Sequence, residues 1–215
     1  MTTGIQRLAL AALAASALAG GLSACAPLVI GGAMVGGTLI AVDRRTSGTQ
    51  LEDEGIEFRA TNRTKDAMGD KAHVNVTSYN RQVLLTGEVP TEADRALVEK
   101  TVKEVDNVRA VVNELAVMPN SSLVQRSNDT LITGKVKASF VDAQDISLNA
   151  FKVVTERNTV FLMGRVTPRE VARVTEIARG VGGVEKVVRV FEIVSEDELA
   201  RYKQAPVTTD SSPKK

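Results

Sequence analysis

The hydrophobic and polar positions of this chain repeat twice along its length at nearly constant spacing. Residues 83–89 read VLLTGEV and residues 160–166 read VFLMGRV, with a glycine late in each segment. Each segment follows a β-rich stretch, 73–79 in the first copy and 150–156 in the second. Two polar residues lie between the β-rich stretch and the segment that follows it. Such paired runs predict a β-hairpin, and the late glycine indicates a bulge or a close backbone approach. The sequence therefore predicts two copies of one unit, each built on a hairpin.

Each predicted hairpin is followed by a helix and a last strand. Thr, Pro and early acidic residues near 90–94 and 167–170 are typical of helix N-termini. The glycine-rich residues 180–183 follow the second helix instead of opening one. We therefore interpret them as a C-terminal helix cap and not as a phosphate-binding loop. The last strands are predicted near 109–117 and 185–194.

A further helix precedes each hairpin and completes the unit. We place it at roughly 52–65 in the first copy and from Thr130 to Val141 in the second copy. The residues expected to cap the second of these helices are Ser127, Asn128 and Asp129. The element order is then α-β-β-α-β in both copies. This order predicts an α+β fold in which two helices cover one face of a three-stranded mixed sheet.

These elements divide the chain into two domains with flanking segments. We expect the domains to span residues 51–118 and 123–195, joined by the polar segment 119–122. Residues 196–215 turn to Pro, Thr, Ser and Lys, a composition that predicts a disordered tail. Residues 25–50 are expected to form a tether.

The N-terminus carries the features of an export signal. Arg7 precedes a short apolar run at 8–19, and small residues then lead to the sequence LSAC, which ends at Cys25. This arrangement predicts a secretory signal peptide over residues 1–24, because the apolar run is too short to span a bilayer. LSAC resembles the bacterial lipobox, in which the cysteine is acylated. We therefore expect lipid on Cys25 to fix the protein to a membrane.

The predicted tether has an apolar part and a charged part. Residues 28–42 are apolar and rich in glycine, which fits either a close-packing helix or, as we prefer, a flexible segment beside the anchored lipid. Arg44 and Arg45 follow. They could contact anionic lipid, or they could be solvated charges of a linker.

Composition limits the functions that this chain can have. The formal net charge is +1, and the chain has no Trp and only two Tyr, so nothing favours a nucleic-acid partner. His73 is the only histidine and Cys25 the only cysteine, so neither a catalytic triad nor a zinc site built from His and Cys can be assembled. We expect no catalytic residue, no metal site and no cofactor, and we interpret His73 as structural.

The two units resemble domains of the BON family. The residues that carry the resemblance are the V-x-L-x-G-x-V strands and a later pattern, N-V-x-x-V at 107–111 and G-V-x-x-V at 183–187. A lipobox followed by two such units is similar to the dual-BON outer-membrane lipoproteins. The resemblance implies a non-enzymatic protein at the outer membrane, facing the periplasm, that supports envelope integrity. It also implies that the second domain binds anionic phospholipid through its first helix.

Carried onto this sequence, the resemblance assigns the lipid contact to the outward side of the helix that ends at Val141. Helical spacing separates Ile132 and Val136, expected in the core, from the outward positions. The lipid-binding residues expected there are Leu131, Lys135, Lys137, Ala138 and Val141. Apolar residues beside lysines suit a membrane surface. The alternative is a periplasmic adaptor that binds envelope proteins of an outer-membrane assembly or secretion machine.

Overall fold

The computed structural model describes residues 43–204, with side chains described up to residue 200. The predicted signal peptide, Cys25 and the apolar part of the tether lie outside these residues, as does the end of the tail from residue 205. Within the described part of the chain, no helix combines the length and the hydrophobicity needed to cross a membrane.

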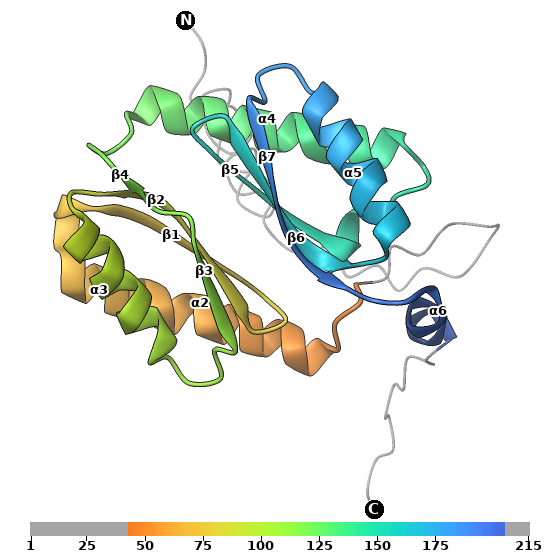
Figure 1. Ribbon diagram of the computed structural model, residues 1–215, viewed down its shortest axis with the longest axis horizontal. Coiled ribbons are helices and arrows are strands. Elements are labelled where there is room, and N and C mark those ends of the chain that lie inside the picture. The colour runs from red at the N-terminus through yellow and green to blue at the C-terminus, as the bar shows by residue number, and fades with distance from the viewer. Residues whose placement is uncertain (1–42, 205–215) are drawn as a thin grey trace, which may run out of the picture. The chain divides into compact units, whose positions relative to one another are not determined.

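The described residues form two α-β-β-α-β units in succession (Figure 1). The elements of the first unit are α2 (Ser47–Met68), the 3-10 turn η2 (Gly69–Lys71), β1 (His73–Tyr79), β2 (Gln82–Val89), α3 (Glu92–Lys103), β3 (Ala110–Asn113) and β4 (Ala116–Val117). The elements of the second unit are α4 (Leu123–Asp142), the 3-10 turn η3 (Leu148–Ala150), β5 (Phe151–Glu156), β6 (Thr159–Val166), α5 (Pro168–Gly180) and β7 (Lys186–Ile193), and α6 (Glu196–Gln204) follows.

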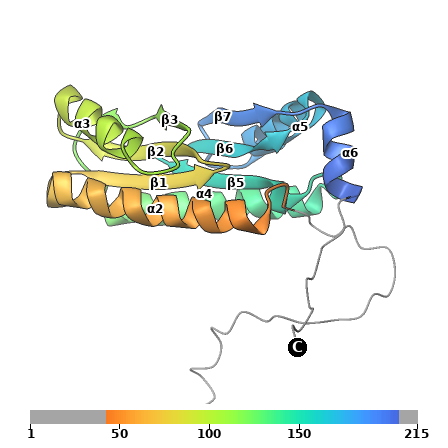
Figure 2. The same ribbon diagram turned by 90° about the horizontal axis from the view of Figure 1, so that it is seen from below.

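Both sheets are mixed, and the hairpin supplies their first two strands. In the first unit β2 lies between β1, which is antiparallel to it, and β3, which is parallel; the short β4 continues alongside β2. In the second unit β6 lies between antiparallel β5 and parallel β7. Both helices of a unit cover the same face of its sheet. Figure 2 shows α2 beside β1 and α3 nearer β3, and in the second unit α4 lies beside β5 and α5 beside β7. The predicted α+β fold is confirmed.

A buried aspartate on each leading helix positions each hairpin turn. The turn residues, Asn80–Arg81 and Arg157–Asn158, all have positive φ, the conformation of two-residue hairpin turns. In this conformation their N–H groups point away from the sheet. Asp53 accepts hydrogen bonds from the N–H groups of Asn80 (2.8 Å) and Arg81 (2.7 Å). Asp129 does the same for Arg157 (3.0 Å) and Asn158 (2.9 Å), so one interaction fixes the turn against the helix in both units.

Two predicted helix starts are therefore corrected. Asp129 is not a cap, because α4 already begins at Leu123 and its N-cap is Ser122, whose hydroxyl accepts from Gln125 N–H at 3.2 Å. The predicted start at Thr130 came several residues too late. In the same way α2 begins at Ser47 and not near residue 52, with Thr46 as its N-cap.

The residues before α2 are part of the fold and not a linker. Arg44 is buried and donates to both carboxylate oxygens of Glu170 on α5 (2.8 and 2.5 Å) and to the carbonyl of Arg165 (2.6 Å). Arg45 bonds Asp53 and lies over the ring of Tyr79, 4.4 Å from its centroid. Both alternatives considered for these arginines, solvated linker charges and contact with lipid, are therefore wrong.

The segment after the second domain is also more ordered than predicted. Residues 196–204 form α6, where disorder was expected from 196 onward. Leu199 of α6 is buried, and Glu198 bonds Arg165 on β6 at 2.8 Å. An acidic first turn suits a helix N-terminus, which explains why these polar residues form a helix.

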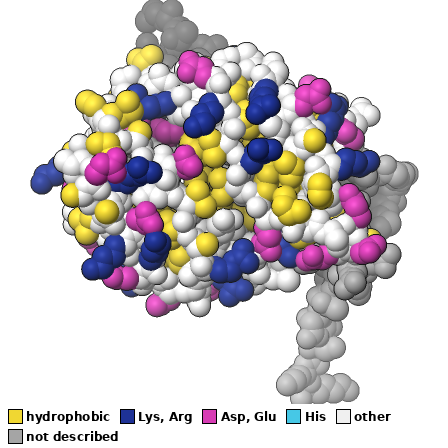
Figure 3. Space-filling view, in the orientation of Figure 1, with side chains coloured by type: hydrophobic (Ala, Val, Ile, Leu, Met, Phe, Trp, Pro, Cys, Tyr) yellow, Lys and Arg dark blue, Asp and Glu magenta, His cyan; other side chains and the backbone are white. Residues whose placement is uncertain are grey.

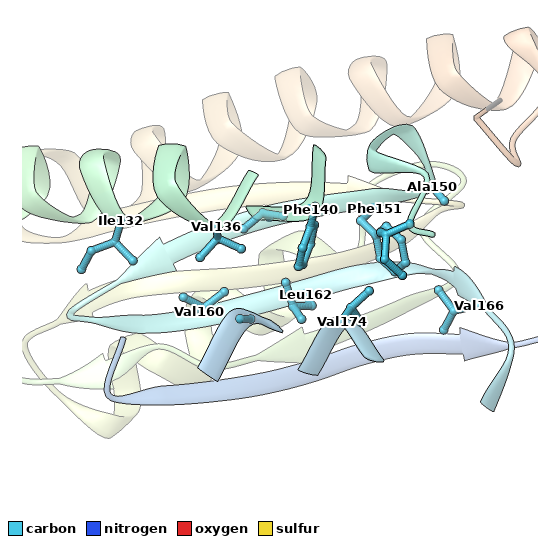
Figure 4. Close-up of a cluster of buried hydrophobic side chains, with 12 residues drawn as sticks. Ile132, Val136, Phe140, Ala150, Phe151, Val160, Leu162, Val166 and Val174 are labelled. Carbon is cyan, nitrogen blue, oxygen red and sulfur yellow. The ribbon is translucent and has the colours of Figure 1, made fainter. Parts of the chain in front are cut away.

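Each unit has its own apolar core between helices and sheet. Figure 4 shows Ile132, Val136 and Phe140 of α4 pointing toward Val160 and Leu162 of β6. An equivalent core lies under α2 and α3. A third cluster joins the sheet faces that the helices leave uncovered, and its buried members are Tyr79, Leu84, Phe161, Met163 and Val190. The two units therefore pack sheet against sheet.

The late strand glycines mark close backbone approaches, as predicted. A Cβ at Gly87, whose φ is +111°, would lie 2.0 Å from the carbonyl oxygen of His73. A Cβ at Gly164 would lie 2.5 Å from the carbonyl oxygen of Ala150. No side chain fits at these distances, so glycine is required at both positions.

Candidate functional site

The exposed side of α4 carries all five residues predicted to bind lipid. The side chains of Leu131 and Val141 are 64% and 59% exposed. Lys135, Lys137 and Ala138 are exposed as well. The opposite side of α4 is formed by the buried residues Asp129, Ile132, Val136 and Phe140.

The charges on α4 flank its apolar residues. At 3.6 residues per turn, Leu131, Ala138 and Val141 lie around the line that points directly away from the core. We call these three residues the α4 strip. Lys135 lies on one side of the strip and Lys137 on the other, and neither lysine forms an ion pair with a described residue. The arrangement leaves two unneutralised ammonium groups beside an exposed apolar surface.

The first turn of α4 adds apolar residues that the sequence analysis missed. Leu123 and Val124 are among the most exposed large side chains of the described residues. They were missed because the helix was expected to begin only at Thr130. The available signal was Ser122, a residue type strongly preferred at helix N-caps.

A shallow groove of about 630 Å³ runs between α4 and α5, next to one edge of the α4 strip. Its lining residues are Lys135, Ser139, Arg173, Glu176, Ile177, Gly180, Val181 and Gly182. Arg173 is engaged by Asp145 at 3.1 Å. Lys135 is therefore the lining cation best placed to meet an anionic group beside the strip.

The side of the molecule seen in Figure 3 is charged with both signs. Lysines, arginines and acidic side chains alternate there with small apolar areas. Apolar residues of similar size to those on α4 also occur on α2, where Leu51 and Phe58 are about 70% exposed. Exposure alone thus does not single out α4; the pair of free lysines beside its apolar residues does.

A second group of polar residues lies where the two units meet. His73 of β1, Glu88 of β2 and Glu156 of β5 place ring nitrogen and carboxylate oxygens within 4.8 Å of one another. His73 Nδ1 lies 3.1 Å from Glu88 Oε2 and 3.7 Å from Glu156 Oε1. We call these three residues the interdomain cluster. Sequence reasoning missed it because its members are distant in the sequence and belong to different units.

The two carboxyls of this cluster have shifted pKa values of opposite sign. Burial would raise the pKa of Glu88, but hydrogen bonds from Ser121 N–H, Arg157 and His73 outweigh it, so this pKa lies below its ordinary value. Burial raises the pKa of Glu156 above its ordinary value, against the opposing hydrogen bond from Asn75, and the carboxylate of Glu88 adds to the increase. Of the two carboxyl groups, Glu156 is therefore the one that more readily takes up a proton.

With this geometry established, comparison with known proteins is informative. The family model of the BON domain matches residues 53–119 and 128–195. The chain belongs to the BON domain family. It is 40% identical over 174 residues to the outer membrane lipoprotein DolP of Haemophilus influenzae, an alignment that covers 80% of this chain and 89% of the relative.

Two further similarities have lower sequence identity. The chain is 35% identical over 155 residues to a 21 kDa hemolysin of Actinobacillus pleuropneumoniae, covering 71% of this chain and 80% of that protein. Among solved structures it is similar to CdsD, a structural protein of the type III secretion system of Chlamydia trachomatis, at 11% identity and a TM-score of 0.27 over 73% of this chain and 99% of that one. The likeness to CdsD is too low to inform function. The DolP relative confirms the expected family and outer-membrane location.

Proposed function

We propose that this protein is a non-enzymatic outer-membrane lipoprotein, anchored by lipid on Cys25, whose second BON domain binds anionic phospholipid through α4 and thereby supports envelope integrity. The observation that carries this proposal is the α4 strip, flanked by two lysines that form no ion pair with a described residue. The expectation from the family resemblance, lipid binding through the first helix of the second domain, supports the same helix.

The physical chemistry of the surface favours a bilayer interface. Leu131 and Val141 would bury apolar area in the acyl boundary, where each fully buried side chain contributes about 1.5–3 kcal/mol. Lys135 and Lys137 have long apolar stems that can lie along this region while their ammonium groups reach the phosphates. Each lysine near an anionic leaflet contributes about 1 kcal/mol.

The anchor and the helix would act together. A lipid on Cys25 keeps the second domain close to the membrane, so the contact through α4 occurs at a high effective concentration. A weak interaction is then sufficient to orient the domain on the surface. We infer that α4 reads the charge of the leaflet, while the acyl chains provide the attachment.

Vesicle binding tests this proposal. Residues 43–215 contain every described element and lack the anchor, so they report on the domains alone. We expect them to co-sediment with phosphatidylglycerol vesicles and not with phosphatidylcholine vesicles. Leu131→Glu should abolish binding, because it puts a carboxylate into the α4 strip. Leu51→Glu is the matched control: an exposed leucine on the leading helix of the other unit, where the same substitution should leave binding unchanged.

Two results would count against lipid binding through α4. Equal loss of binding in Leu51→Glu and Leu131→Glu would show that any added acid on the surface suffices. Absence of binding to both vesicle types would leave Cys25 as the sole membrane contact. A periplasmic adaptor that docks proteins on exposed apolar residues such as Phe58 would then be favoured.

A further inference from the structure

We propose that the interdomain cluster, His73, Glu88 and Glu156, is a binding site for a divalent first-row transition metal ion, represented by Zn²⁺. This inference is independent of lipid binding, because the cluster lies between the two sheets and shares no residue with the α4 strip.

The spacing of the three donor atoms is close to what a metal ion needs. In a tetrahedral zinc site with bonds of 2.0–2.1 Å, neighbouring ligand atoms are separated by roughly 3.4 Å. His73 Nδ1 is 3.1 Å from Glu88 Oε2 and 3.7 Å from Glu156 Oε1. All three atoms lie within 4.8 Å of one another, and hydrogen bonds from Ser121 and Arg157 fix the carboxylate of Glu88 in this position.

The chemistry of the donors selects the kind of ion. One imidazole nitrogen with two carboxylate oxygens suits zinc and its neighbours better than calcium or magnesium, which prefer oxygen alone. Binding would replace the contact between Nδ1 and Glu88 by two bonds to the metal, and water would complete the coordination.

One carboxylate oxygen of Glu156 has no hydrogen-bond donor among the described residues. Its Oε2 accepts a hydrogen bond from Asn75 at 2.8 Å. Its Oε1 points toward His73 at 3.7 Å, beyond hydrogen-bond range, and accepts no hydrogen bond from another described residue. The residue is only 7% exposed. A carboxylate oxygen that accepts no hydrogen bond from the described residues is available as a ligand for a cation in the cluster.

The local charge balance also favours a cation. Glu88, which is fully buried, Glu156 and Asp129 bring three carboxylates to this region. Arg157, which donates to Glu88 Oε1 at 2.6 Å, and the imidazole of His73 face them. Arg157 and Arg126, which donates to the Ser121 hydroxyl beside Glu88 at 3.1 Å, are the arginines next to these three carboxylates, so a divalent cation would add to the compensating charge.

The fold itself does not require this group of residues. At the offset that relates the two units, His73, Glu88 and Glu156 correspond to Ala150, Arg165 and Tyr79. At that other end of the interface, Tyr79 instead donates its hydroxyl to the Ala150 carbonyl at 3.2 Å. Equivalent positions can therefore close the interface without a cluster of metal-binding groups.

Metal titration of the whole protein tests the proposal. The mature chain, purified without a histidine tag in detergent micelles and stripped with EDTA, should bind one Zn²⁺ per chain in a calorimetric titration. We expect His73→Asn and Glu156→Gln each to weaken this binding at least tenfold. Glu57→Gln is the matched control, because Glu57 is a carboxylate outside the cluster that pairs with Lys152 across the same interface.

A measurement on the unmodified protein keeps the proposal falsifiable if a variant fails to fold. His73 is the only histidine, so its ring protons give isolated NMR signals, which should shift on addition of one equivalent of Zn²⁺. Unshifted signals, or a stoichiometric zinc affinity equal in His73→Asn and the unmodified protein, would overturn the proposal.

Discussion

Replacing Asp53 by Asn tests whether the buried aspartate holds the first hairpin turn. Asp53 is fully buried and accepts four hydrogen bonds: Oδ1 from the Ser78 hydroxyl and Arg81 N–H, and Oδ2 from Asn80 N–H and the Arg45 guanidinium. An asparagine side chain has nearly the same shape, but one acceptor becomes an NH₂ group that faces donors. Two of the four hydrogen bonds are then lost.

The size of this effect follows from the lost hydrogen bonds and the ion pair with Arg45. Hydrogen bonds to a charged group contribute about 1.5–3 kcal/mol each, and breaking a buried ion pair on one side costs about 3–5 kcal/mol. We therefore expect Asp53→Asn to lower the free energy of unfolding by about 3–5 kcal/mol. Asp129→Asn should cost less, because Asp129 lacks the partner guanidinium and the serine hydroxyl.

Urea unfolding of residues 43–215, followed by circular dichroism, measures these differences. Asp66→Asn is the matched control on the same helix, at an exposed position where the change should be within about 0.5 kcal/mol. A loss below about 1 kcal/mol in Asp53→Asn would refute the reasoning.

The same aspartate predicts a pH dependence. Burial would raise the pKa of Asp53, but hydrogen bonds from Ser78, Arg81, Arg45 and Asn80 outweigh it, so the folded pKa lies below the ordinary value. A lowered folded pKa means that the stabilisation is fully present above the unfolded pKa of about 3.9. It is lost as the pH falls from there through the folded pKa, and Asp53→Asn should remove this acid-dependent part.

Four further substitutions test other parts of the structure. Arg44→Ala should lower the free energy of unfolding in urea by about 3 kcal/mol, because the carboxylate of Glu170 loses the guanidinium that pairs with it. A loss under about 0.5 kcal/mol would show that Arg44 does not stabilise the fold and is only a linker residue. Gly87→Ala should prevent folding or lower the free energy of unfolding by more than about 3 kcal/mol, because the added Cβ would clash with the carbonyl of His73 in β1. Gly134→Ala is the contrasting change: a Cβ there meets open space on α4, so the free energy of unfolding should rise by about 1 kcal/mol. Because the folded pKa of Glu156 is raised, its ionisation opposes folding as the pH rises through that pKa. Glu156→Gln should therefore raise the melting temperature of the metal-free protein more at pH 8 than at pH 4, and an equal effect at both would contradict the shift.

Local patterns predicted the repeated unit correctly because they depend on neighbours in the sequence. The two-residue turns, the late strand glycines and the capping box of α5, formed by Thr167 and Glu170, are all encoded within a few residues. The outward side of α4 followed from helical spacing once Ile132 and Val136 were assigned to the core.

Contacts between distant residues account for what the sequence analysis missed. Arg44 looks like a linker charge until α5 brings Glu170 to it. Asp129 looks like a cap because aspartate is common there, whereas it bonds a turn that lies farther along the chain. The interdomain cluster depends on how the two sheets pack, which no local pattern specifies.

The most direct test of lipid recognition by α4 is reversal of its two free charges. Lys135→Glu with Lys137→Glu should weaken binding of residues 43–215 to phosphatidylglycerol vesicles by at least about 30-fold, since removing two lysines already costs about 2 kcal/mol. The matched double variant, Lys65→Glu with Lys100→Glu, reverses two exposed lysines of the first unit and should bind as the unmodified protein does. Equal weakening in both double variants, or none in the α4 variant, would contradict the proposed role of α4.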